Sequence, residues 1–83
     1  MKKEICVGIV NDLYSKIYDY TDIGGDSVLE LMDDILEQYD KYDMLMHFIE
    51  EDPSIDEYTE ERYAELVEVM QIALEEIEFN FLP

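Results

Sequence analysis

Basic residues are scarce in this chain of 83 residues, in which five Lys and Arg stand against 23 Asp and Glu. The formal net charge is −18, which makes free nucleic acid and anionic membranes poor partners and basic protein surfaces good ones. The same charge also keeps a protein soluble. Charge alone therefore does not separate a docking surface from a well-solvated one.

Cysteine and histidine are present once each, as Cys6 and His47. A single cysteine excludes an internal disulfide and fits a reducing cytoplasm. Cys6 lies on an apolar stripe without a neighbouring base, so we expect a buried structural thiol rather than a nucleophile. One histidine excludes a His-based zinc site, and no nucleophile elbow is present for a Ser-His-Asp triad. We therefore predict no metal, no catalytic residue and no enzymatic activity, with His47 half-buried.

Long apolar runs are also missing from the sequence. Residues 5–10 are too few for a secretory signal or a membrane span, and Asn11 and Asp12 end the stretch. We therefore expect a cytoplasmic protein. A chain of this length forms one domain with a thin core, residues 1–83, and its seven Tyr and three Phe argue against disorder.

Helical periodicity is the main pattern that is present. Between Lys3 and about Tyr18, apolar residues recur every fourth position, with Cys6, Val10 and Tyr14 beside them: Ile5, Ile9, Leu13 and Ile17. Residues 21–26 have loop character because of Gly24 and Gly25. A second helix is predicted from about Asp26 to Tyr39, with an inner face of Val28, Leu31, Met32, Ile35 and Tyr39 and with Leu36 beside it.

The second half of the chain predicts two more helices. A polar joint at residues 40–43 leads into a short apolar segment at residues 44–51. Pro53 then breaks the chain, and Ser54 with Glu57 has the form of a capping box. A long stripe predicts a last helix from Thr59 to about Phe79, in one piece or broken near Tyr58: Tyr63, Leu66, Val67, Met70, Leu74 and Ile77. The pattern indicates an all-α antiparallel four-helix bundle, with three longer helices and a short third helix.

One short segment carries more than periodicity: YTDIGGDSVLEL, residues 20–31. As local structure, the two glycines allow a tight turn, Asp26 is a good N-cap, and Ser27 with Glu30 has capping-box form. The segment also resembles the attachment site of phosphopantetheine carrier proteins, especially the peptidyl carriers of nonribosomal peptide biosynthesis. The aromatic, acid, Gly-Gly-Asp-Ser and aliphatic places of that motif are filled in order by residues 20 and 22–28. Residues 48–58, FIEEDPSIDEY, are similar to the family's closing motif, with one extra residue before Pro53.

The resemblance implies a stand-alone carrier protein with a carrier-like helical fold. Ser27 would bear a covalent 4′-phosphopantetheine, whose thiol carries an aminoacyl or acyl group as a thioester. The implied partners are a phosphopantetheinyl transferase, an activating ligase and downstream biosynthetic enzymes with basic docking patches. The residues expected to contact these partners surround Ser27: Asp26, Val28, Leu29, Glu30, Met32, Asp33 and Met46.

A function of another class stays open beside the carrier. An acidic helical bundle of this size is also compatible with an inhibitor, either an immunity protein that binds a toxin or a nucleic-acid mimic that blocks a basic groove. In that case Gly24 and Gly25 form only a turn. The acidic faces of the second and last helices would then contact the target.

Overall fold

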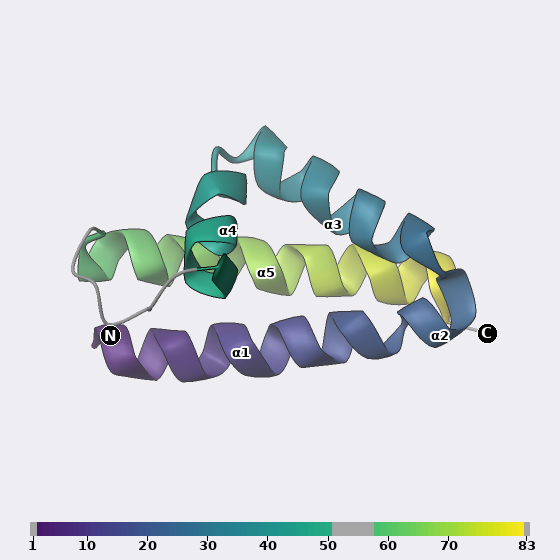
Figure 1. The fold of residues 1–83 in the computed structure, drawn as a ribbon, viewed down its shortest axis with the longest axis horizontal. Helices are drawn as coiled ribbons and strands as arrows, with labels where there is room; N and C mark the ends of the chain where they lie inside the picture. The colour runs from purple at the N-terminus through teal and green to yellow at the C-terminus, as the bar shows by residue number, and fades with distance from the viewer. Residues whose placement is uncertain (1, 51–57, 83) are drawn as a thin grey trace.

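The computed structural model describes residues 2–50 and 58–82. Regular structure in these two ranges is entirely helical, which confirms the all-α class. The order is α1 (Lys3–Asp19), α2 (Thr21–Gly24), α3 (Asp26–Gln38), α4 (Tyr42–Glu50) and α5 (Glu60–Phe81) (Figure 1). Part of the segment expected to be a loop forms the short α2. The predicted Pro53 break and the Ser54 capping box lie outside the described residues.

The two longest helices, α1 and α5, lie side by side and run in the same direction (Figure 1). At one end, the Lys3 ammonium lies 5.2 Å from the centroid of the Tyr63 ring. At the other end, the Tyr20 hydroxyl donates to Glu78 Oε2 at 3.3 Å. The expectation of an antiparallel bundle is therefore wrong for this pair. Among the helices of residues 2–50 and 58–82, α3 is the one that runs back against them (Figure 1).

The buried line of α1 differs from the one predicted. Ile5 is 54% exposed, whereas a second set of side chains faces the core: Cys6, Val10, Leu13 and Ile17. A step of four residues advances about 40° beyond a full turn of an α-helix, so a strict four-residue repeat drifts around the helix. Alternating steps of four and three keep one face. The prediction of a buried Cys6 thiol is confirmed.

The core forms where α1, α3, α4 and α5 meet. From α3 the buried residues are Val28, Met32, Ile35 and Leu36, whereas Leu31 is half-buried and Tyr39 is 45% exposed. The long helix α5 is unbroken and contributes the largest share: Tyr63, Leu66, Val67, Val69, Met70, Ala73 and Ile77. His47 on α4 is half-buried, as predicted, and its ring packs edge-on against Tyr58.

The helix α5 begins at the Thr59 N-cap, whose Oγ1 accepts a hydrogen bond from the Arg62 amide at 3.3 Å. This bond satisfies one of the N–H groups that a helix start leaves without an acceptor. The sequence left open whether the last helix has a break near Tyr58. The described part of the helix begins directly after that point and continues to Phe81 in one piece.

The turn between α3 and α4 is closed by backbone and side-chain contacts. Asp40 has a φ of 58°, and the amides of Asp40 and Lys41 donate to the carbonyls of Glu37 and Leu36. This is the pattern of a helix ended by a left-handed residue. Lys41 is only 8% exposed, and its ammonium lies 3.0 Å from Glu65 Oε2 on α5. The turn is thereby attached to the long helix.

The two glycines before α3 have different roles. Gly25 has a φ of 60° and a ψ of −145°, close to a region of backbone space that is essentially restricted to glycine. Gly24 is needed for space, because a Cβ built there would lie 2.5 Å from Phe81 Cδ1 and 2.6 Å from Val28 Cγ2. Gly25 is the N-cap of α3, which has no side-chain cap hydrogen bond. The predicted Asp26 cap and Ser27 capping box therefore do not form.

We predict that Gly24→Ala lowers the free energy of unfolding by about 1–3 kcal/mol, because the added methyl group must displace Phe81 and Val28. Gly8 is a matched control inside α1, since a Cβ at Gly8 meets nothing within 4 Å. Gly8→Ala should raise the free energy of unfolding by about 0.5–1 kcal/mol through helix propensity. Urea unfolding measures both changes. Stabilisation by both substitutions would contradict the packing of the α5 end against α2.

Candidate functional site

Ser27 is exposed and is the second residue of α3. The turn before it is open, because a Cβ at Gly25 would meet nothing within 4 Å. The first amides of an α-helix have no acceptor within the helix, and the helix dipole favours an anion beside them. The Ser27 hydroxyl is therefore accessible to another molecule, and a phosphate attached there would lie at a favourable helix end.

The predicted partner-docking residues divide into two groups in the structure. Val28 and Met32 are 0% and 4% exposed, because they lie on the side of α3 that faces the core. Their assignment to a partner interface is therefore corrected. Of the others, Asp26 and Glu30 are exposed, whereas three are half-buried: Leu29, Asp33 and Met46. Leu29 packs against the core with part of its surface, so it is less free than an isolated surface leucine.

Carboxylates crowd the outer side of α3, which contains no Lys or Arg. The pKa of Asp33 is raised from its ordinary value of 3.8, first by partial burial and then by the carboxylates of Glu37, Asp34 and Glu30. Each of these neighbours disfavours a further negative charge. The crowding is a property of the folded chain, because these side chains meet only on a helix.

Carboxylates of α4 join those of α3 around Tyr42. The pKa of Tyr42 is raised first by the Asp33 carboxylate, then by partial burial, and further by Glu37, Glu50 and Asp43. We call the carboxylates that act on Asp33 or Tyr42, together with Asp33 itself, the α3–α4 acidic surface: Glu30, Asp33, Asp34, Glu37, Asp43 and Glu50. The sequence did not predict that Tyr42, Asp43 and Glu50 belong to this surface. Their place on it depends on the turn at Asp40 and Lys41, which brings α4 against α3.

The shifted pKa values of Asp33 and Glu65 act on stability in opposite directions. A raised pKa at Asp33 gives stability that is complete below the ordinary value of 3.8 and is lost as pH rises through the folded value. The ionised carboxylate thus weakens the fold at neutral pH. The pKa of Glu65 is lowered, first by its hydrogen bond from Lys41. Glu65 therefore stabilises the fold above its ordinary value of 4.5, and this contribution is lost as pH falls through the folded value.

The chain's bases do not neutralise the α3–α4 acidic surface. The Lys41 ammonium pairs with Glu65 on α5. The Arg62 guanidinium carbon lies 5.9 Å from the centroid of the Tyr58 ring, and Lys3 lies over Tyr63. Lys2 is the N-cap of α1, and Lys16 lies in the last turn of that helix. The negative field of the α3–α4 acidic surface therefore has no internal counter-charge among these described contacts.

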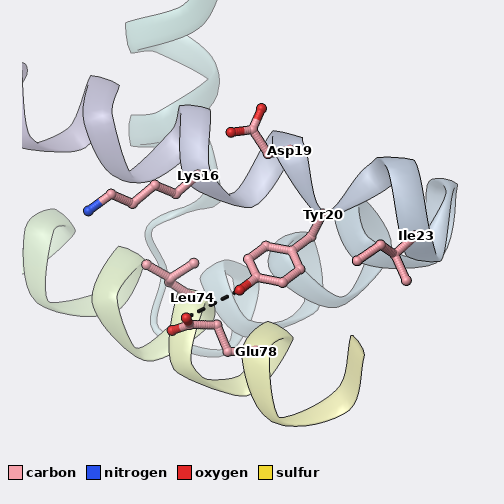
Figure 2. Close-up of a pocket in the computed structure, with 6 residues that line it drawn as sticks. All are labelled: Lys16, Asp19, Tyr20, Ile23, Leu74 and Glu78. Atoms are coloured by element: carbon pink, nitrogen blue, oxygen red, sulfur yellow. Dashed lines mark hydrogen bonds between the residues drawn. The ribbon is translucent and has the colours of Figure 1, made fainter. Parts of the chain in front are cut away.

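A separate hollow of about 370 Å³ lies between the C-terminal ends of α1 and α5 (Figure 2). The Tyr20 ring crosses it towards Glu78, and the rest of the lining is Lys16, Asp19, Ile23 and Leu74. Partial burial, and then the Glu78 carboxylate, raise the pKa of Tyr20 above its ordinary value of 10.0. Neither Ser27 nor a carboxylate of α3 lines this hollow. It therefore does not join the candidate site.

Within residues 2–50 and 58–82, no three His, Cys, Asp or Glu side chains are grouped so as to hold a metal ion. None of the helices described in those ranges is both long enough and apolar enough to cross a bilayer.

No protein-family model, curated protein or solved structure matches this chain. The carrier assignment stays a prediction from residues 20–28 and 48–58, and residues 51–57 of the second motif lie outside the described ranges.

Proposed function

We propose that this protein acts by binding a basic surface of another protein through its α3–α4 acidic surface. The observation that supports the proposal is the gathering of carboxylates on α3 and α4, which raise the pKa of Tyr42 and add to the effect of partial burial on the pKa of Asp33. A cationic partner would relieve this repulsion on binding. Complementary charge of this kind raises the rate of encounter and fixes the register of docking.

Binding of this kind is suited to inhibition. The carboxylates from Glu30 to Glu37 extend over about 10 Å of helix, and Asp43 and Glu50 widen the surface across α4. A basic groove covered by such a surface is closed to its own anionic ligand. The proposed role is therefore that of an acidic inhibitor, either a nucleic-acid mimic or a toxin immunity protein, which is the alternative that the sequence left open beside the carrier.

A matched pair of double variants tests this proposal with a peptide of about nine lysines as the probe. Glu30→Lys with Asp34→Lys reverses two exposed carboxylates of α3, and should weaken binding about tenfold, or about 1.4 kcal/mol. Glu75→Lys with Glu76→Lys changes the net charge equally on the exposed side of α5, and should weaken binding much less. Isothermal titration calorimetry at one fixed salt concentration gives both affinities.

Equal losses in the two double variants would mean that binding follows net charge alone. That result would contradict a located surface on α3 and α4. A wild-type protein that does not bind the peptide at low salt would contradict the proposed function itself.

Ser27 supports a second proposed function, that of a carrier protein. Its exposed hydroxyl follows an open turn and lies at a helix start that favours a phosphate. In this proposal the Ser27 oxygen displaces adenosine 3′,5′-bisphosphate from coenzyme A, and the arm then carries an acyl or aminoacyl thioester. The carrier comes second because Gly24 and Gly25 both have roles in the fold that would be needed without any attached group.

The carrier proposal predicts a mass change on one residue. Incubation with coenzyme A and a broad-specificity phosphopantetheinyl transferase should add one phosphopantetheine group, and Ser27→Ala should abolish the addition. Because α3 has no side-chain cap hydrogen bond, Ser27→Ala should leave the thermal midpoint nearly unchanged. Intact mass spectrometry reads the modification. A wild-type protein left unmodified by two unrelated transferases would overturn the carrier proposal and leave the first proposal standing.

A further inference from the structure

The first residue of α4, Tyr42, lies beside a small hollow in the α3–α4 acidic surface. The hollow has a volume of about 200 Å³ and is lined by Glu37, Asp40, Tyr42 and Asp43. Pockets for drug-sized ligands occupy roughly 300–1,000 Å³. A space of this size, open at the surface, is better suited to one side chain of a partner protein than to a separate small molecule.

Elsewhere in the molecule, cationic side chains lie over or near tyrosine rings. The Lys3 ammonium lies over Tyr63, and the Arg62 guanidinium lies near the Tyr58 ring. Within residues 2–50 and 58–82, no cation of the chain lies over the Tyr42 ring in this way. Its neighbour Lys41 is directed to Glu65 on α5 at 3.0 Å. Tyr42 thus combines an aromatic ring and surrounding carboxylates without an internal cation.

We infer that the hollow beside Tyr42 receives an arginine side chain from the basic partner surface. The inference rests on the proposed binding function and names its point of contact. A planar guanidinium can stack on the Tyr42 ring while its N–H groups donate to the Glu37 and Asp43 carboxylates. A lysine ammonium supplies the charge without the planar face, and it is more strongly hydrated. The hollow therefore favours arginine over lysine.

Peptides of about nine arginines and about nine lysines are the probes for this inference. Wild-type protein should bind the arginine peptide about tenfold more tightly at equal salt. Tyr42→Leu should remove most of that preference and leave the lysine peptide nearly unaffected, whereas Tyr42→Phe keeps the ring and should preserve it. Tyr39→Leu is the matched control, because Tyr39 is an exposed tyrosine at the end of α3 that does not line the hollow.

The outcomes separate this inference from the function on which it rests. If neither peptide binds wild-type protein, the proposed function fails. If both bind but Tyr42→Leu and Tyr39→Leu retain the same arginine preference, the binding function stands and the Tyr42 site is wrong. Circular dichroism checks that Tyr42→Leu is folded. If Tyr42→Leu unfolds, Asp43→Asn gives the same test. We expect Asp43→Asn to reduce the difference in affinity between the arginine and lysine peptides. An unchanged difference would overturn the inference.

Discussion

Repulsion among carboxylates is the constraint on which the rest of this structure depends. With 23 acids and five bases, the fold must keep carboxylates apart while it builds a core from 83 residues. Helices solve part of the problem, because each one places its apolar stripe inward and its acids outward. The bases contribute at joints, where Lys41 attaches the α3–α4 turn to Glu65. Carboxylates gather on α3 and α4, where they raise the pKa of Tyr42 and add to the effect of partial burial on the pKa of Asp33.

The helices could be predicted from the sequence because their apolar residues recur with a helical period, and α3 and α5 begin within one residue of their predicted starts. The relative directions of the helices could not be predicted, because the periodicity of one helix does not determine how a neighbouring helix is oriented. The parallel pairing of α1 with α5 depends on contacts such as Tyr20 with Glu78, which are distant in sequence. The same limit explains the wrong assignment of Val28 and Met32 to a partner interface. Their place beside Ser27 indicated a docking role, yet the face of α3 on which they lie is covered by the other helices.

The Gly-Gly-Asp-Ser segment shows why a short motif can have two explanations. The tight turn was predictable from the glycines themselves. The need for Gly24 was not predictable, because one of the two side chains that exclude a Cβ there belongs to Phe81, at the far end of the chain. Asp26 and Ser27 are the parts of the motif that the fold leaves unexplained, since neither side chain makes a capping bond, and of the two only Ser27 has a hydroxyl that could bear an attached group. That difference is why Ser27 supports a separate proposal, whereas the acidic surface is supported by electrostatics spread over two helices.

Thermal unfolding of wild-type protein and Asp33→Asn at pH 7, at ionic strengths of about 0.01 M and 0.1 M, is the most direct measurement of this repulsion among carboxylates. Salt shortens the screening length from about 30 Å to about 10 Å over that range. Our account predicts that the wild-type midpoint rises with salt, and that Asp33→Asn starts higher and rises less, because one crowded carboxylate is gone. A wild-type midpoint that is flat or falls, with Asp33→Asn no more stable at low salt, would contradict it.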